Sequence, residues 1–136
     1  MNNENKIKLF LVDDDAVFLK SLEIDFLAHA DFVIETYATG ELCMKSIAHS
    51  PDVIILDYHL DGIKKNAMNG METLDKIKAV NADIPVVMLS AQDEIDIALQ
   101  CMSHKAFDYV VKSANDFLRL KKVIIPFLIA ELGIGN

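Results

Sequence analysis

A fivefold alternation of short apolar runs with amphipathic segments is the feature that most constrains the fold of this chain. The apolar runs are rich in Val, Ile, Leu and Phe and cover residues 7–12, 32–37, 53–56, 86–89 and 107–111. Each run is followed by a stretch with helical periodicity, as in Phe18, Leu19, Leu22 and Phe26. A regular alternation of strands and helices predicts an α/β domain built on a parallel sheet.

The predicted strands are expected to be buried on both faces. Their apolar runs are continuous rather than alternating with polar residues, which is typical of a parallel sheet covered by helices on each side. We therefore predict a doubly wound, flavodoxin-like sheet of five parallel strands in the order 2-1-3-4-5. Turn signals agree with this division, including Thr39-Gly40 before the second helix and Ser113 as a cap for the last one.

Length and composition indicate one domain. The 136 residues are 52% hydrophobic, which suits a single domain over residues 1–136, with a core of about 7–127 and a C-terminal helix to about 132. The formal net charge of -8 argues against a nucleic-acid surface. No apolar run reaches the roughly 18 residues of a membrane span and no signal peptide is evident, so we expect a cytoplasmic protein that does not contact the membrane. Cys43 and Cys101 fall in helical segments and are expected to be buried thiols.

Polar residues stand at the carboxyl ends of the predicted strands. The first run is followed by Asp13 and Asp14, the third by Asp57, the fourth by Ser90 and the fifth by Lys112. In the predicted order, the first and third strands are neighbours at the point where the strand order reverses, and ligands bind at that point. We therefore expect Asp13, Asp14 and Asp57 to face one another.

A cluster of carboxylates needs a cation to offset its charge. Two carboxylates about 4 Å apart repel by roughly 4 kcal/mol at an effective dielectric constant of 20. The ligands here are few, hard oxygens, which favours a partly hydrated Mg²⁺ shared with a phosphate over a fully caged Ca²⁺. The four histidines show no zinc-ligand spacing with one another or with the cysteines. Mg²⁺ is therefore the predicted cofactor.

Four motifs resemble those of the response-regulator receiver domains of two-component signalling. They are LVDDD at 11–15, VIILDYHLDG at 53–62, VVMLSA at 86–91 and FDYVVK at 107–112, and the resemblance covers roughly residues 7–127. It implies a phosphorelay function, in which a partner histidine kinase or histidine phosphotransfer protein supplies the phosphoryl group. A downstream protein partner or a linked effector domain would receive the signal. The domain would be no enzyme beyond self-directed phosphotransfer and autodephosphorylation.

The resemblance also implies roles for the residues at the acidic end of the site. Asp57 would accept the phosphoryl group in a reaction that requires Mg²⁺. Asp14, Asp57 and the backbone carbonyl of His59 would bind the metal directly, and Asp13 would act through a water molecule.

Three further residues would respond to the phosphoryl group by the same resemblance. Ser90 would bind it as the switch hydroxyl, Lys112 would hold one of its oxygens, and Tyr109 would be the aromatic side chain that rotates. The surface that changes would be made by the fourth helix, fifth strand and fifth helix, roughly residues 93–131. This surface is also the candidate face for a homodimer.

The chain departs from the family pattern at three places. Asp61 stands where receivers usually carry Pro, and the loop over residues 58–70 is longer than usual. That loop is either a tolerated surface insertion or a segment that tunes the lifetime of the acyl phosphate or the choice of partner. The family's Lys-Pro pair is Lys112-Ser113 here. No effector domain follows, so both a stand-alone receiver and a fragment of a larger regulator fit the sequence.

Two other interpretations remain open from the residues alone. The run from Asp13 to Val17 also fits the DxDx(T/V) motif of haloacid-dehalogenase-like phosphatases, in which Asp13 would be the nucleophile. Those enzymes need a later strand that ends in an acidic pair after the lysine, and Glu131 is the only acidic residue after Asp116. A degenerate receiver would keep the fold and serve only as a protein-binding module.

Overall fold

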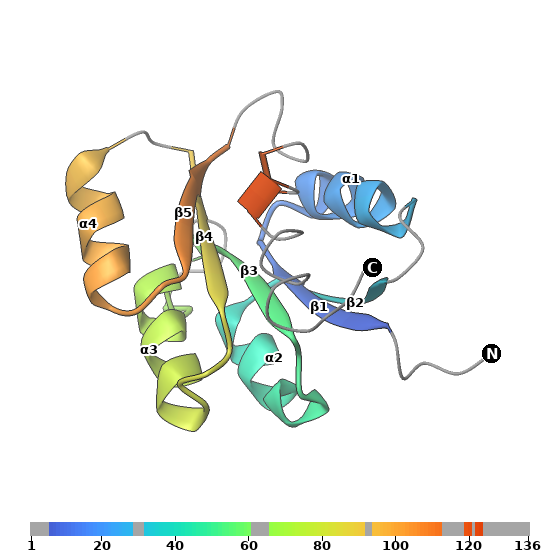
Figure 1. Cartoon of the computed structure of the whole chain (residues 1–136), viewed down its shortest axis with the longest axis horizontal. Helices are drawn as coiled ribbons and strands as arrows, with labels where there is room; N and C mark the ends of the chain where they lie inside the picture. The colour runs from blue at the N-terminus through green and yellow to red at the C-terminus, as the bar shows by residue number, and fades with distance from the viewer. Residues whose placement is uncertain are drawn as a thin grey trace.

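Five parallel strands form one sheet in the computed structural model, which describes residues 6–28, 32–60, 66–91, 94–112, 119–120 and 122–123 (Figure 1). The sheet has the predicted order β2-β1-β3-β4-β5. Its strands are β1 (Ile7–Val12), β2 (Phe32–Tyr37), β3 (Val53–Asp57), β4 (Val86–Ser90) and β5 (Asp108–Val111). Strands β3 and β4 run one residue further than predicted because Asp57 and Ser90 still pair with the neighbouring strands, opposite Leu89 and Val111.

Helices cover both faces of this sheet. Helix α1 (Ala16–Leu27) lies on one face, and α2 (Gly40–Lys45), α3 (Gly70–Val80) and α4 (Ile95–Ser103) lie on the other (Figure 1). A short 3-10 helix, η1 (Ile47–His49), follows α2. Residues 119–120 and 122–123 are helical and lie within the segment for which a C-terminal helix is predicted. The rest of that segment, Ser113 and the Lys112-Ser113 bond lie outside the described residues.

Two hydrophobic clusters fill the space between the sheet and its helices. Alternate residues of β1 supply both, because successive strand side chains point to opposite faces. Leu9 and Leu11 join the cluster under α1, whereas Phe10 and Val12 join the one under α2, α3 and α4. The prediction of strands buried on both faces is confirmed for β1, β3 and β4, whereas the edge strands β2 and β5 are mostly half-buried. Cys43 and Cys101 are buried free thiols.

Polar caps set the residues at which the helices begin. Asp15 accepts backbone N–H groups in the first turn of α1, and Thr39 does the same for α2. Asn69 and Glu72 form a capping box at the start of α3. The caps of α1 and α3 directly follow the loops at the carboxyl ends of β1 and β3, so they help to hold those loops in place.

The side chain of Lys78 reaches past the end of α3. It is half-buried, and its ammonium donates to the carbonyl oxygens of Ala82, at 3.2 Å, and Ile84. Burial lowers the pKa of Lys78, and the charge of Asp83 acts in the opposite direction. Carbonyl groups after a helix end lack intrahelical donors, and a long lysine side chain can reach them.

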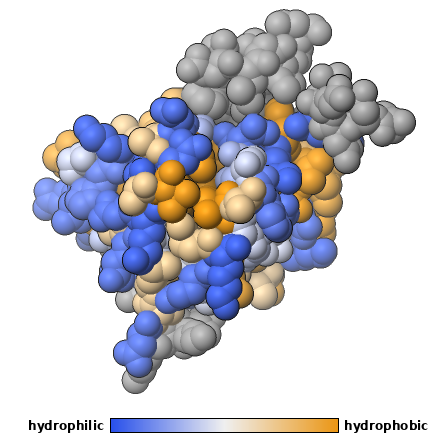
Figure 2. Space-filling model, turned by 90° about the horizontal axis from the view of Figure 1, so that it is seen from below, coloured by the Kyte–Doolittle hydropathy of each residue, from blue (hydrophilic) through white to orange (hydrophobic). Residues whose placement is uncertain are grey.

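The described surface is mostly polar on the face shown in Figure 2, where hydrophilic side chains surround a small apolar area near the centre. Apolar areas of this kind are ordinary on soluble domains and need no special explanation. In the described part of the chain, no helix has the length and apolar character that a membrane crossing requires. The cytoplasmic location remains a prediction.

Candidate functional site

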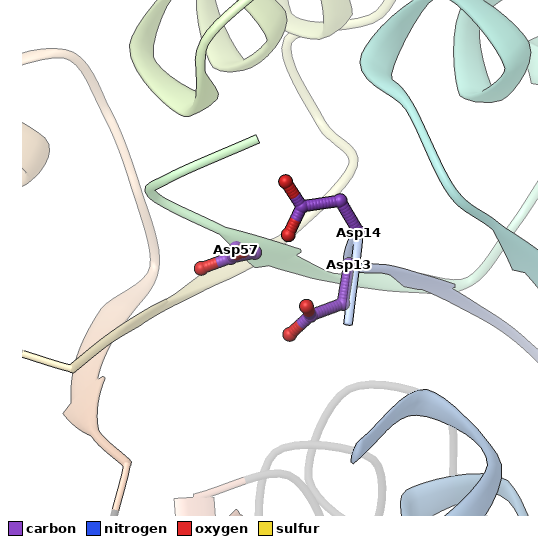
Figure 3. A group of neighbouring side chains, drawn as sticks. All are labelled: Asp13, Asp14 and Asp57. Carbon is purple, nitrogen blue, oxygen red and sulfur yellow. The ribbon is translucent and has the colours of Figure 1, made fainter. Parts of the chain in front are cut away.

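Three carboxylates meet at the carboxyl ends of β1 and β3 (Figure 3). Asp13 and Asp14 directly follow β1, and Asp57 is the last residue of β3. Each offers an oxygen that lies within 4.8 Å of the oxygens of the other two. The two strands are paired neighbours, with Val12 opposite Leu56, so the residues after these positions reach the same edge of the sheet. The structure thus brings together the three acidic residues that the sequence singled out.

Backbone groups orient two of these carboxylates. The N–H of Asp13 donates to the carbonyl oxygen of Tyr37 at 3.0 Å, which continues the pairing of β1 with β2. The Oδ1 of Asp13 accepts the N–H of Asp15 at 2.9 Å, and the Oδ1 of Asp57 accepts the N–H of His59 at 3.2 Å. Both aspartates are only 2% exposed.

Lys112 brings a positive charge to this cluster. It follows β5, and its N–H donates to the carbonyl oxygen of Ser90 at 2.7 Å. Its ammonium lies 2.9 Å from Asp13 Oδ2 and 3.5 Å from Asp57 Oδ1. Among the described residues, no donor makes a hydrogen bond of regular geometry with Asp13 Oδ2. Its contact with the Lys112 ammonium is therefore described as an ion pair. One ammonium against three carboxylates leaves the cluster with an excess of negative charge.

The pKa values follow from burial and from this charge imbalance. Burial raises the pKa of Asp57 to about 6, with repulsion from Asp13 and Asp14 in the same direction and the charge of Lys112 in the opposite one. Burial by itself would lower the pKa of Lys112. The close contact with the Asp13 carboxylate and the charges of Asp57 and Asp13 outweigh burial and raise the pKa of Lys112 above its usual value.

The donor set fits a hard divalent cation. Three carboxylate oxygens converge from two strand ends, and the buried Asp13 Oδ2 has no regular hydrogen bond from the part of the chain that the structure describes. Such a cation would lower the repulsion that raises the pKa of Asp57. Mg²⁺ prefers a few carboxylates together with water and phosphate oxygens, and the composition of this cluster suits it.

Ser90 lies on β4, next to the strand that ends in Asp57, and Tyr109 lies on β5, one strand further out. Ser90 is fully buried at the end of β4, one residue beyond the position opposite Asp57. Tyr109 is half-buried on β5, opposite Met88, and packs against the hydrophobic cluster under α2, α3 and α4. Both positions suit the roles implied by the resemblance, which remain predictions.

The predicted loop over residues 58–70 is closed at its base. The N–H of Gly70 donates to the carbonyl oxygen of Tyr58 at 3.0 Å, and the N–H of Met68 donates to Glu41 Oε2 at 2.8 Å. The side chain of His59 is exposed. Residues 61–65, which include Asp61, Lys64 and Lys65, lie outside the described residues, so the role of the loop also remains a prediction.

Sequence reasoning missed two features of the site. The Phe18 ring lies against Lys112, but its periodicity in an amphipathic helix indicated only a core position. Gly70 lies so close to the end of β3 that a Cβ there would be 2.5 Å from the carbonyl oxygen of Asp57, and no pattern in the sequence indicated this approach. The capping signature of Asn69 and Glu72 was a local signal for the helix start that carries this glycine.

Comparison with known proteins identifies relatives of this chain. Residues 9–124 match the family described as the response regulator receiver domain. The chain is 36% identical to a protein-glutamate methylesterase/protein-glutamine glutaminase of Clostridium acetobutylicum. That match spans 117 residues and covers 82% of this chain and 32% of that protein. The chain is also 32% identical to regulatory protein LuxO of Vibrio cholerae. That match spans 109 residues and covers 79% of this chain and 23% of that protein. The chain thus spans a third or less of these two relatives.

Solved structures share the fold. A chain of the CheX-CheY-BeF3-Mg²⁺ complex from Borrelia burgdorferi superposes with a TM-score of 0.75 at 26% identity, over 89% of each chain. A CheY-like receiver domain protein from Methanospirillum hungatei has a TM-score of 0.78 at 20% identity, over 94% of this chain and 98% of that one. The family match includes every strand end that carries a candidate site residue and does not favour the phosphatase interpretation. The chain therefore belongs to the response regulator receiver domains of two-component signalling.

Proposed function

We propose that Asp57 is the phosphoacceptor of this receiver domain and that its donor is a phosphohistidine on a histidine kinase or histidine phosphotransfer protein. The placement of Asp57 carries the proposal. Its carboxylate ends β3, lies beside two other carboxylates and is 3.5 Å from the ammonium of Lys112. An acceptor carboxylate and charged groups to receive a phosphoryl group are thus present together.

Phosphoryl transfer needs an in-line nucleophile and charge stabilisation more than covalent help from the protein. An oxygen of Asp57 attacks the phosphorus while the bond from phosphorus to the donor imidazole breaks. The electron pair of that bond returns to the imidazole nitrogen, which then takes a proton. The ammonium of Lys112 turns from Asp13 toward a phosphoryl oxygen, and the hydroxyl of Ser90 donates to another.

Mg²⁺ is the cofactor in this proposal. Asp14, Asp57 and the backbone carbonyl of His59 would hold it directly, and Asp13 would hold it through water. When bound, it supplies positive charge that offsets the carboxylates and the incoming phosphoryl group. The Borrelia burgdorferi complex contains BeF3 and Mg²⁺, which supports the same cofactor here.

The signal leaves the domain through the surface of α4, β5 and the C-terminal helix, over residues 93–131. When Ser90 binds the phosphoryl group, Tyr109 turns inward on the neighbouring strand and the surface repacks. Such a change biases a partner only if the partner touches the repacked face. The recipient is a downstream protein or a linked effector domain, and a second copy of the chain is the candidate for self-association. The domain also removes its own phosphoryl group by hydrolysis of the acyl phosphate.

Intact-mass measurement tests the assignment. Incubation of the chain with acetyl phosphate and Mg²⁺ should add one phosphoryl group, and Asp57→Asn should abolish the addition because the nucleophilic oxygen is lost. Asp13→Asn is the matched control and should keep some labelling. Labelling that survives Asp57→Asn and disappears in Asp13→Asn would favour the haloacid-dehalogenase-like nucleophile, and an unlabelled wild-type chain would favour a degenerate receiver.

A further inference from the structure

The ammonium of Lys112 contacts an aromatic ring as well as two carboxylates. It lies 4.5 Å from the centre of the Phe18 ring, 2.9 Å from Asp13 Oδ2 and 3.5 Å from Asp57 Oδ1. An ammonium within about 6 Å of a ring centroid is attracted to the negative face of the ring. The lysine head is therefore held by Phe18 of α1 as well as by residues at the ends of β1 and β3.

The start of α1 fixes the position of this ring. Asp15 caps the helix by accepting the N–H groups of Val17 and Phe18, each at 3.1 Å. The N–H of Asp15 in turn donates to Oδ1 of Asp13 at 2.9 Å. The ring is half-buried and packs against the hydrophobic cluster under α1. The turn that presents Asp13 therefore also presents Phe18, and the two approach the same ammonium.

We propose that Phe18 is a positioning residue, whose ring holds the Lys112 ammonium at the site before the phosphoryl group arrives. The inference rests on the proposed roles of Asp57 and Lys112. Lysine carries its charge on a flexible four-carbon stem, and the side chain of Lys112 is 21% exposed, so rotamers that face solvent are available to it. The ring disfavours those rotamers. A leucine would fill the same space under α1 but has no negative face to attract the ammonium.

Two substitutions at Phe18 distinguish the effect of the aromatic ring from the effect of apolar packing. Phe18→Leu keeps an apolar contact with the core and removes the ring, whereas Phe18→Tyr keeps the ring. We expect Phe18→Leu to slow the labelling of Asp57 by acetyl phosphate about two- to fivefold, the rate equivalent of one cation–π contact. Phe18→Tyr should label at nearly the wild-type rate. Leu19→Val, in the same helical turn and against the same cluster, is the control for packing loss alone.

A double-mutant cycle tests whether the ring acts through the lysine. In a Lys112→Ala background, Phe18→Leu should cause no further slowing of labelling, and Mg²⁺ affinity should stay unchanged in Phe18→Leu. Equal slowing with and without Lys112, or a loss of Mg²⁺ affinity, would overturn the proposal because the ring would then act on the whole site. If Phe18→Leu does not fold, Phe18→Met serves the same purpose, since methionine adapts to irregular core space.

A measurement on the unphosphorylated chain keeps this inference separate from the proposed function. The side-chain methylene protons of Lys112 should show an upfield ring-current shift in the NMR spectrum of the wild type and of Phe18→Tyr, and should lose it in Phe18→Leu. Unshifted methylene protons in the wild type would overturn the inference even if Asp57 is labelled. A wild-type chain that shows the shift but takes no phosphoryl group at Asp57 would instead refute the proposed function.

Discussion

Asp57 is ionised at neutral pH at a cost to the stability of the fold. It is 2% exposed, and burial with repulsion from Asp13 raises its pKa to about 6, above the 3.8 of a free side chain. The folded chain therefore holds this proton more tightly than the unfolded chain does. The stabilising contribution of Asp57 is complete below about pH 4 and is lost as the pH rises through about 6.

We predict that Asp57→Asn stabilises the metal-free chain at pH 7 by roughly 1–3 kcal/mol, because it removes a buried charge and keeps an acceptor for the N–H of His59. The difference from wild type should shrink as the pH falls from 7 to 4. Thermal unfolding in the presence of a chelator at several pH values measures it, with the exposed Asp96→Asn as the control. A variant that unfolds at or below the wild-type temperature at pH 7 would mean that Lys112 more than offsets burial and repulsion.

Among the structural elements, α3 docks directly onto the end of β3. The N–H of Gly70, the first residue of α3, donates to the carbonyl oxygen of Tyr58 at 3.0 Å. A Cβ at Gly70 would lie 2.5 Å from the carbonyl oxygen of Asp57 and 2.6 Å from the Cα of Tyr58, closer than real Cβ contacts come. This close approach requires a glycine. The loop over residues 58–70 therefore begins and ends at the same place, beside the end of β3. This explains how the end of β3 keeps its geometry although the loop is longer than usual.

We predict that Gly70→Ala destabilises the fold by about 1–3 kcal/mol through overpacking against backbone. It should also slow the labelling of Asp57, because the strand end that carries the acceptor must move. Chemical denaturation and acetyl phosphate labelling measure the two effects.

Gly40→Ala is the matched control for that substitution. A Cβ at Gly40 would lie 2.0 Å from Thr73 Oγ1, a side-chain atom, so Thr73→Ala should relieve much of the strain. Labelling of the folded Gly40→Ala chain should stay near the wild-type rate. A Gly70→Ala chain with native stability and native labelling would contradict the docking of α3 on the acceptor strand.

At the scale of the whole molecule, α4 leaves one apolar face uncovered by the described parts of the chain. Ile95, Leu99 and Met102 are 74%, 63% and 44% exposed. Their spacing of four and three residues places them on one side of the helix. This side belongs to the surface that we propose repacks on phosphorylation, and exposed apolar area on such a surface favours contact with another protein.

We predict that beryllofluoride with Mg²⁺ promotes self-association through this face and that Ile95→Lys weakens it severalfold, because a buried lysine would lack a partner. Sedimentation velocity with and without beryllofluoride measures the association. Val80→Lys places the same charge on α3, where the wild-type side chain is 61% exposed, and should have no effect. A chain that stays monomeric in both states would rule out self-association and leave a different protein as the recipient.

The sequence by itself determined the fold and most of the candidate site. Continuous apolar runs require a sheet that is covered on both faces, and the alternation with helices makes that sheet parallel. In such a sheet the carboxyl ends of neighbouring strands share one edge, so Asp13, Asp14 and Asp57 had to meet there. This inference needs only the order of the strands and the residue that follows each one.

Only the tertiary structure decided which of these groups touch and what surrounds them. The ion pair of Lys112 with Asp13, the Phe18 ring against the ammonium and the approach of Gly70 to Asp57 all join separate elements. The inward turn of Lys78 likewise depends on where the chain runs after α3. Hydrophobic periodicity specifies which face of a helix or strand is buried. Contacts between side chains depend instead on how separate elements pack in space, and no local pattern encodes those distances.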